Sequence, residues 1–502
     1  MAIYVLTTSG ALTGLTAYDD GVYFGASLQW VNGSLPYRDF VFVHPPGIIM
    51  LLSPLALLGK VIGSSSAFAL ARIVTEVVVV ANAGLASLLL RRHGAAAMVL
   101  SGLGVALYPL AVFNASTVTL EPYLIFFCLL GIFGVVCATK TEVPRRALVW
   151  AGIGFGIAGL VKVWAVFPFF AAALCVLWWY RRAGLRFVMA TALTFGIPAG
   201  FFAVMSPGNF FHDVIMDQVF RQPSLYQQAS IGTRLDNIFG FPYLAKPWLH
   251  PSMAVDIAVV VVIVVLASII VDRAQTNRAD FIVVIVCAGS LACLLVGAEY
   301  QMYYSYFPIP FLVPTLVISL HRLWRGILER AQLSSPRPRY GMGVAALLVV
   351  VAVLLAGLNA GRDASWQRFI LSHHLRGNGG NIVQPAAMVS LLVPPGACTI
   401  SDSPAELILA NRYLSSSPDC PAIVDPYGMF LALNNGQLPP NIEPLTPLIL
   451  DQWTAALHAA RCVVLTAPLS DYVAWDPVLL GWFRKNFTSV YSARLITIYL
   501  RY

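Results

Sequence analysis

The stretch Ala17-Tyr18-Asp19-Asp20-Gly21-Val22-Tyr23 places two adjacent carboxylates directly after the first apolar segment of the chain. Most of the sequence around it has the composition of membrane helix, where ionisable residues are costly and usually functional. The alternative is a pair of acidic residues that begins a helix in water. The pattern of the loops that follow favours the functional interpretation.

Composition identifies a membrane protein. Of the 502 residues, 58% are hydrophobic and only 11% are charged, which is far too apolar for a soluble globular protein. The net charge of +8 lies entirely in residues 1–361, which carry 22 basic and 14 acidic side chains, because residues 362–502 carry nine of each. Such an excess is what the positive-inside rule produces, so it does not indicate nucleic-acid binding.

The apolar runs predict a chain that crosses the membrane about eleven times. The first segment, residues 1–17, has no charged start or cleavage site, so we expect no cleavable signal peptide. It is also shorter than the roughly 20 residues of a full span, so we expect part of this helix to precede residue 1. The other ten runs are residues 67–90, 95–113, 122–138, 147–160, 163–180, 187–204, 254–271, 279–297, 307–320 and 341–359.

Basic residues concentrate in alternate loops, which we assign to the cytoplasm. These residues are Arg91, Arg92, Lys140, Arg145, Arg146, Arg181, Arg182, Arg186, Arg273, Arg278 and the arginines from Arg322 to Arg339. A further apolar run, residues 47–63, would invert every later loop if it crossed the membrane. We therefore predict a juxtamembrane helix at the outer surface there. Asp19, Asp20 and most other polar residues of interest then share the outer face.

The predicted fold is a polytopic α-helical membrane protein with a C-terminal extracytoplasmic α/β domain. Residues 1–361 form the membrane domain, with outer loops at 18–66 and 205–253, and residues 362–502 form the α/β domain. In the latter we predict strands at 397–400, 422–424, 462–465 and 493–499 and helices at 404–411 and 451–460. A Cys398–Cys420 disulfide is compatible with an oxidising compartment, although Cys462 makes the number of cysteines in this domain odd.

The acidic pair and four later features together resemble one known family. After the acidic pair come Gly33-Ser34-Leu35-Pro36-Tyr37-Arg38-Asp39-Phe40 and His44-Pro45-Pro46, then Glu121 and the tyrosine-rich residues 299–306. Over residues 15–330 this pattern is similar to the GT-C superfamily of membrane glycosyltransferases, which includes protein O-mannosyltransferases and lipid A aminoarabinose transferases. The resemblance implies inverting transfer of a sugar from a polyprenyl-phosphate donor to an acceptor at the outer side of the membrane.

Sugar transfer requires a carboxylate that takes a proton from the attacking hydroxyl. We assign Asp19 as this base and Asp20 as its partner or as a metal ligand, although the reverse assignment is nearly as good, since a neighbouring acid tunes either one. Mg²⁺ or Mn²⁺ held by these carboxylates is one hypothesis, and a metal-free base is equally consistent.

Other side chains are candidates for binding the acceptor. By resemblance Glu121 is the second acidic position of the superfamily, and the alternative is an acid that complements the helix dipole. Tyr303 and Tyr304 are candidates for stacking on a sugar, although an interfacial aromatic belt explains them as well.

The departing phosphate requires cations or hydrogen-bond donors. By resemblance His44 occupies the position at which many relatives carry a lysine that holds the lipid phosphate. Lys162 is a stronger electrostatic candidate, with an interfacial lysine as the alternative. Arg38 either binds phosphate or pairs with Asp39 or Asp20.

Three further assignments complete the set. Arg221 and Arg234, in the 205–253 loop, are candidate phosphate ligands or ordinary interfacial charges. Arg72 and Glu76 stand four residues apart in one helix and are predicted to pair with each other.

The sequence therefore predicts a glycosyltransferase in a bacterial cytoplasmic membrane. The donor would be a polyprenyl-phosphate-linked mannose or arabinofuranose, and the acceptor an envelope glycan, a glycolipid or a protein. A lipid or glycan transporter or flippase is one alternative, and an inactive acceptor-binding scaffold is another. A transporter would place its charges near mid-bilayer, whereas here they gather at one surface.

Overall fold

A computed structural model describes most of the chain. It covers residues 12, 14, 15, 17–140, 144–220, 229–240, 251–271, 277–297, 300–330, 385–434, 446–493 and 496–501. The predicted first span, the span at 341–359 and the boundary near residue 361 lie mainly or wholly outside these residues.

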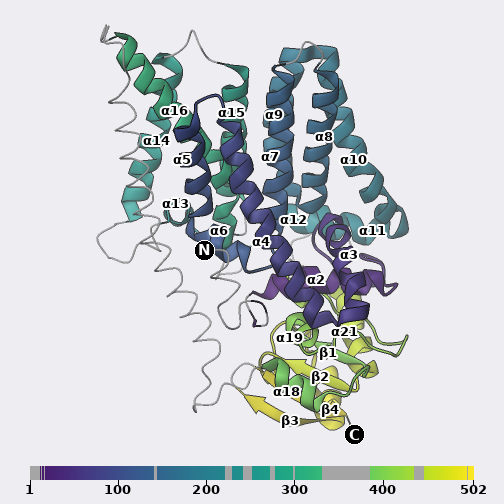
Figure 1. Cartoon of the computed structure of the whole chain (residues 1–502). Helices are drawn as coiled ribbons and strands as arrows, with labels where there is room; N and C mark the ends of the chain where they lie inside the picture. Colours follow the sequence, from purple (N-terminus) through teal and green to yellow (C-terminus); the bar gives the residue numbers. More distant parts are fainter. Residues whose placement is uncertain are drawn as a thin grey trace.

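Long apolar helices form a bundle, with the C-terminal domain below it in Figure 1. Each of the nine predicted runs between 67 and 320 contains helix. The helices are α4 (Ser64–Leu89), α5 (Ala95–Ala106), α6 (Pro109–Ala115), α7 (Leu120–Ala138), α8 (Arg145–Val161), α9 (Val166–Tyr180), α10 (Gly184–Met205), α14 (Pro251–Val271), α15 (Arg278–Val296) and α16 (Ile309–Arg330).

Among the described residues, six helical stretches are long and apolar enough to cross a membrane. A seventh is obtained if α5 and α6, which are bent by 62° relative to each other, form one span. The longest stretch, Val163–Met205, contains both α9 and α10, which Figure 1 shows as the two legs of a hairpin around Arg181–Ala183. The predicted polytopic α-helical fold is thus confirmed.

Glycines allow α7 and α8 to pack closely. A Cβ atom on Gly154 would lie 2.9 Å from the backbone nitrogen of Gly131, and one on Gly134 would lie 2.8 Å from the Cβ of Ala151. Small residues at such an interface let the helix backbones approach closely. The resulting van der Waals packing holds membrane helices together, because the hydrophobic effect does not drive helix association in lipid.

The predicted cytoplasmic loops meet at one end of the bundle. Arg92, His93 and Arg322 contact the carboxylate of Asp280 at distances of 2.9, 3.0 and 2.9 Å. The guanidinium of Arg278 lies 5.8 Å from the centre of the Trp179 ring, which brings the turn after α9 to the same end. Asp19, Asp20 and Glu121 occupy the opposite end, where the C-terminal domain docks.

Shorter elements form the lower end of the bundle. They are α2 (Tyr18–Val31), α3 (Gly47–Ile62), η1 (Val163–Ala165), α11 (Pro207–Phe211), the π-helix η3 (His212–Met216), α12 (Asp217–Phe220), α13 (Ile231–Ile238) and the 3-10 helix η6 (Met302–Tyr306). In Figure 1, α3 is viewed nearly along its axis, so it lies across the direction of the long helices. Its last two turns expose Leu57, Leu58, Val61 and Ile62.

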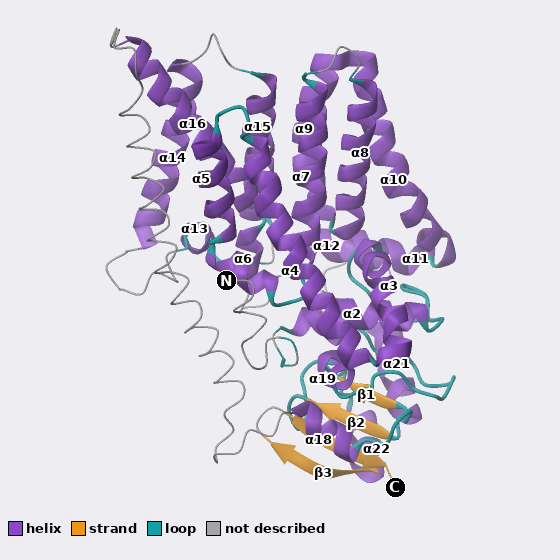
Figure 2. Ribbon diagram, viewed as in Figure 1, coloured by secondary structure: helices purple, strands orange, loops and turns teal. Residues whose placement is uncertain are grey.

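The C-terminal domain contains a four-stranded sheet, drawn in orange in Figure 2. Its elements are α18 (Pro385–Leu392), β1 (Thr399–Ser401), α19 (Pro404–Leu409), α20 (Pro426–Asn434), α21 (Thr446–Ala459), β2 (Cys462–Leu465), α22 (Pro477–Asn486), β3 (Phe487–Ala493) and β4 (Ile496–Arg501). The strand order is β1-β2-β4-β3, with β1 and β2 parallel and the other two pairs antiparallel.

Three of the four predicted strands and both predicted helices are present in this domain. The prediction of a strand at 422–424 is wrong. These residues lie between Pro421 and Pro426 and are too few to form a ladder before the next helix begins. β3 was not predicted. Cys398 and Cys420 form a disulfide, while Cys462 is free and buried.

The C-terminal domain packs directly on α2 and α4. Gly21 faces α19 so closely that a Cβ atom would lie 2.5 Å from the backbone nitrogen of Ala405. The side chain of Asn411 accepts a hydrogen bond from the backbone of Ser65, and the Ser64 hydroxyl donates to the carbonyl of Ile408. The C-terminal domain therefore docks on the helix that begins with the acidic pair.

Candidate active site

The two carboxylates of the acidic pair have different environments. They begin α2, where successive residues are rotated by about 100° around the helix axis, so adjacent side chains face different ways. Asp20 is fully buried, whereas Asp19 is partly exposed. The helix geometry thus separates the two acids that the sequence places side by side.

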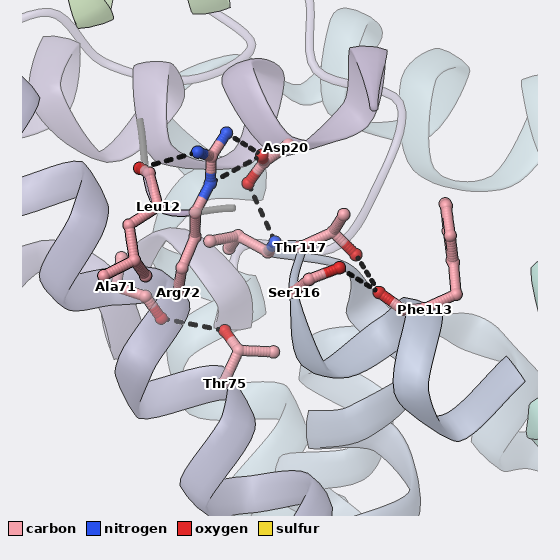
Figure 3. A network of polar contacts seen from close by, with 9 residues as sticks. Leu12, Asp20, Ala71, Arg72, Thr75, Phe113, Ser116 and Thr117 are labelled. Carbon is pink, nitrogen blue, oxygen red and sulfur yellow. Dashed lines mark hydrogen bonds and ion pairs between the residues drawn. The ribbon is translucent and has the colours of Figure 1, made fainter. Parts of the chain in front are cut away.

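Asp20 is bound inside the protein on two sides (Figure 3). Nε of Arg72 lies 2.9 Å from Oδ2 of Asp20, Nη2 contacts the same oxygen, and the backbone nitrogen of Val118 donates to Oδ1 at 2.8 Å. Both side chains of the ion pair are at most 1% exposed. Asp20 therefore ties α2 to α4 and to the segment before α7.

The predicted ion pair between Arg72 and Glu76 is wrong. Arg72 uses its guanidinium for Asp20 and for the carbonyl of Leu12, and it lies over the ring of Phe68 at 4.3 Å. A partner far along the chain thus replaces the neighbour one turn away. The carboxylate oxygens of Glu76 are buried without a hydrogen-bond partner among the described residues.

Asp19 lines a small cavity of about 40 Å³ together with His44, Tyr303, Tyr304 and Asp425. The hydroxyl of Tyr303 donates a hydrogen bond of 2.5 Å to Oδ2 of Asp19. Tyr303 and Tyr304 come from η6, directly before α16. The structure thus brings the acid and both tyrosines together at the lower end of the bundle.

Glu121 and Lys162 form a second buried ion pair. Nζ of Lys162 lies 2.7 Å from Oε1 of Glu121, and their side chains are 3% and 2% exposed. Nζ also lies 3.7 Å from the centre of the Trp164 ring and 3.9 Å from that of Tyr304. Lys162 takes this position because α8 ends there and its backbone is extended, with φ −152°.

Tyr304 links this ion pair to the cavity. One of its neighbours is the ammonium of Lys162, and its side chain is also part of the cavity wall that contains Asp19. The positive charge of Lys162 therefore lies behind the wall of the cavity, where low dielectric and an aromatic ring strengthen its field.

His44 lines the same cavity and is 7% exposed. Its Nε2 lies 3.3 Å from the hydroxyl of Tyr23, and its backbone carbonyl accepts a 2.7 Å bond from Tyr37. Burial raises the pKa of Tyr23 well above its ordinary value, so this hydroxyl remains protonated. His44 is thus held beside Asp19 by two tyrosines.

Two of the three predicted arginines, Arg38 and Arg234, are described by the structure and do not line this cavity. Arg38 forms an exposed ion pair with its neighbour Asp39 at 2.7 Å. Arg234 binds the carbonyls of Leu294 and Gly297 at 2.7 and 2.6 Å, which completes the C-terminal end of α15. Arg221 lies outside the described residues.

The C-terminal domain contributes a residue that was not predicted. Asp425 lines the cavity with Asp19, and the hydroxyl of Tyr18 donates to its Oδ1 at 3.3 Å. Burial raises the pKa of Tyr18, which keeps it a neutral donor. Asp425 precedes Pro426, and this pattern indicates only the start of a helix. Nothing local in the sequence relates Asp425 to Tyr18, which lies 407 positions earlier.

A second buried acid, Asp213, supports the loop that carries His44. Its Oδ2 accepts a 3.2 Å bond from the backbone nitrogen of Phe42, and its Oδ1 lies 3.3 Å from Nδ1 of His212. Burial raises the pKa of Asp213 to about 6. The sequence places this residue in the outer loop but does not identify its partner.

The residues suited to a metal are Asp19 and Asp425 rather than Asp19 and Asp20. Asp20 is occupied by Arg72 and the backbone of Val118, whereas Asp19 and Asp425 share one cavity. Mg²⁺ is commonly held by one or two carboxylates together with water and substrate phosphate. Within the described part of the chain, no group of three or more His, Cys, Asp or Glu residues is arranged for a metal.

Comparison with known structures identifies the fold. Two structures of ArnT from Cupriavidus metallidurans, one in the apo state and one bound to undecaprenyl phosphate, each match with a TM-score of 0.61. Each alignment covers 99% of this chain and 96% of ArnT, at 14% sequence identity. The chain has the fold of ArnT. The fold that the resemblance implied is therefore confirmed over nearly the whole length of ArnT.

Two other results complete the comparison. AglB from Archaeoglobus fulgidus, an archaeal oligosaccharyltransferase in complex with an inhibitory peptide and a dolichol-phosphate, has a TM-score of 0.47 at 11% identity. That alignment covers 93% of this chain and 69% of AglB. No protein-family model and no curated protein matches the sequence.

Proposed function

We propose that the chain is a membrane glycosyltransferase that moves a sugar from a polyprenyl-phosphate donor to an acceptor hydroxyl. The observation that carries the proposal is the partly exposed Asp19 in a buried polar cavity with Tyr303, His44 and Asp425. The fold also supports the proposal, because it is similar to that of ArnT, which has been solved bound to undecaprenyl phosphate.

In this reaction Asp19 acts as the general base. As the acceptor oxygen forms its bond to the anomeric carbon, its proton passes to the carboxylate of Asp19. The bond between the anomeric carbon and the phosphate oxygen breaks at the same time, and its electron pair leaves with the lipid phosphate. Attack from the side opposite to the phosphate inverts the anomeric carbon.

Tyr303 orients the base. Its hydroxyl donates to Oδ2 of Asp19, which fixes the orientation of the carboxylate in the cavity. Asp20 does not take part in proton transfer in this scheme, since Arg72 neutralises it inside the bundle. Its role is to fix the first turn of α2, which carries Asp19.

His44 and Lys162 stabilise the charge that develops on the departing phosphate. His44 lies in the cavity wall and donates directly when protonated or in the appropriate tautomer. Lys162 acts from behind Tyr304, through its field rather than through contact. If Mg²⁺ or Mn²⁺ takes part, Asp19 and Asp425 would hold it, and it would neutralise phosphate charge.

The remaining details of the proposal come from the sequence. We propose mannose or arabinofuranose as the sugar, and an envelope glycan, a glycolipid or a protein as the acceptor. The reaction would take place at the outer face of a bacterial cytoplasmic membrane, on the side of the bundle that carries the C-terminal domain.

The test is sugar transfer by the detergent-purified protein. Radiolabelled polyprenyl-phosphate mannose and arabinose would be supplied with membrane-extracted acceptors, with and without EDTA. Wild type would be compared with Asp19→Asn and with a control, Asp451→Asn, which changes an exposed carboxylate on α21. Transfer by wild type and the control, but not by the Asp19 variant, supports the proposal.

Two results would contradict it. Full transfer by a folded Asp19→Asn protein would exclude Asp19 as the base. Binding of donor lipid without transfer by the wild type, for either sugar, would favour a lipid transporter or an acceptor-binding scaffold.

A further inference from the structure

A larger cleft lies between α2 and the C-terminal domain, away from Asp19. Its volume is about 500 Å³, which is within the range of small-ligand sites. One wall is the end of α2 and the loop after it, with Gln29, Asn32 and Ser34, and the other is formed by β1, α19 and residues 413–423. The cleft is therefore a junction between the two halves of the molecule.

The lining of this cleft is polar and uncharged. The described residues that line it include Gln29, Asn32, Ser34, Thr399, Ser401, Tyr413 and the run Ser415-Ser416-Ser417, and none of the lining residues is Asp, Glu, Lys, Arg or His. Hydroxyl and amide groups both donate and accept hydrogen bonds. A ligand that carries many hydroxyls and no charge matches this set, whereas a phosphate or a carboxylate would find no counter-charge.

The walls are built to keep their shape. The Cys398–Cys420 disulfide joins β1 to the far end of the serine-containing loop. The backbone nitrogen of Ser416 donates to the carbonyl of Gly396 at 2.9 Å, and that of Ser417 to the hydroxyl of Ser415 at 3.0 Å. The loop is thus held by a covalent bond and by internal hydrogen bonds, which lowers the entropic cost of binding.

Tyr413 joins the cleft to α2. Its side chain is 7% exposed and lines the cleft. Its hydroxyl is buried against α2, where a Cβ atom on Gly25 would lie 2.9 Å from it and the Gln29 side chain lies near it. Tyr413 therefore supports the floor of the cleft.

The position of the cleft relative to Asp19 limits the kind of ligand. Asp19 and Gln29 lie at opposite ends of α2, and ten residues of α helix span roughly 15 Å. A single sugar cannot occupy the cleft and react at Asp19 at the same time, whereas an extended chain of several sugars is long enough to reach from one to the other.

We propose that this cleft binds a neutral oligosaccharide, the part of the acceptor that lies several sugar units from the attacking hydroxyl. The proposal rests on the proposed function and narrows the acceptor to a glycan chain. An unstructured peptide is the competing ligand, but it would require apolar pockets for side chains, whereas hydroxyl and amide groups dominate this lining.

The experiment measures binding directly, so it does not depend on catalysis. Purified full-length protein would be titrated by calorimetry with neutral mannan- and arabinan-derived oligosaccharides of one to eight units, and with a Ser/Asn-rich peptide of similar length. The test variant is Ser34→Trp, which fills the cleft from the loop after α2. The matched control is Ser489→Trp, on the exposed face of β3.

We expect affinity to rise with oligosaccharide length and Ser34→Trp to weaken it by about tenfold or more, which corresponds to the loss of one or two hydrogen bonds. Ser489→Trp should bind as wild type does. Equal affinity in Ser34→Trp and wild type, or binding of the peptide but no sugar, would overturn the proposal.

The two proposals fail in different ways. Oligosaccharide binding that Ser34→Trp abolishes, in a protein that transfers no sugar, supports the cleft and contradicts the proposed function. Sugar transfer without measurable oligosaccharide binding contradicts the cleft and leaves the proposed function intact.

Discussion

Nε of Arg72 lies 2.9 Å from Oδ2 of Asp20, inside the protein and 52 residues away along the chain. This ion pair distinguishes two carboxylates that are neighbours in the sequence. Asp20 becomes part of the framework that holds α2, and Asp19, one residue earlier, lines the cavity and accepts a hydrogen bond from Tyr303. The consequences of this difference are directly measurable.

Substitution of the two aspartates should produce different defects. Asp20→Asn leaves the Arg72 guanidinium buried without its charge partner, so we expect a loss of stability of about 3–5 kcal/mol. Asp19→Asn should change stability little and reduce sugar transfer by about 100-fold or more, as expected for loss of a general base. Thermal unfolding followed by size-exclusion chromatography, together with the transfer assay, measures both. A stable Asp20→Asn protein would show that the ion pair does not hold α2.

The ion pair between Glu121 and Lys162 should show strong coupling. Lys162→Met leaves a buried carboxylate and Glu121→Gln leaves a buried ammonium, so we expect each change to cost about 3–5 kcal/mol. The double variant should cost much less than the sum, because neither charge is then left unpaired. Thermal unfolding of the four proteins completes the cycle.

The same cycle separates structure from chemistry. If Lys162 stabilises the departing phosphate, the stable double variant should remain slow in sugar transfer, with kcat reduced more than the KM for the donor changes. Wild-type kcat in the double variant would show that Lys162 is needed only to neutralise Glu121.

Gly21→Ala should loosen the contact between α2 and the C-terminal domain. Its Cβ would lie 2.5 Å from the backbone nitrogen of Ala405, a distance that requires the two elements to move apart. We expect a destabilisation of about 1–3 kcal/mol and faster proteolysis around α19. Gly84→Ala on α4 is the control, because a Cβ there has no neighbour within 4 Å. Equal effects of both substitutions would contradict this account of the contact.

The stability of the protein should depend on pH in a defined direction. Burial raises the pKa of Glu406 from 4.5 to about 7 and that of Asp213 from 3.8 to about 6. The native state then holds these protons more tightly than the unfolded state, so stability falls as pH rises through these windows and levels off above pH 7.

Glu406→Gln should flatten this dependence between pH 6 and 7, where Asp213 no longer titrates. Above pH 7 the variant should be more stable than wild type by up to about 3 kcal/mol, since one pKa unit corresponds to about 1.4 kcal/mol. Asp213→Asn should instead reduce the slope between pH 4 and 6, where Glu406 still contributes. Unfolding temperatures across pH 4–8 measure both effects, and an unchanged slope in either variant would exclude that residue as its source.

The sequence was sufficient to predict the membrane helices and the small α/β domain. Apolar runs of span length and the alternation of basic loops can be recognised in the sequence itself, because they do not depend on contacts between distant residues. The prediction of a strand at 422–424 was wrong because these three β-branched and small residues, which lie between prolines, have the composition of a strand but no neighbouring strand to pair with among the described residues.

The candidate site was only partly predictable. Asp19, Tyr303 and Tyr304 could be selected by residue type. Nothing in the local sequence indicated that Arg72 forms an ion pair with Asp20 and not with Glu76. Spacing of four residues favours a partner on the same helix, whereas packing of α2 against α4 offers a better-placed carboxylate. Asp425 was missed for the same reason, because its relation to the site is purely three-dimensional.

The cavity has one wall from α2 and another from the C-terminal domain, and Tyr18 and Asp425, which contact each other, are 407 positions apart in the sequence. At a synthesis rate of roughly 5–20 residues per second, the second wall follows the first by roughly 20–80 seconds. During that interval α2 is present without the C-terminal domain that packs on it. The cavity around Asp19 is therefore complete only after the C-terminal domain has been synthesised and has docked on α2.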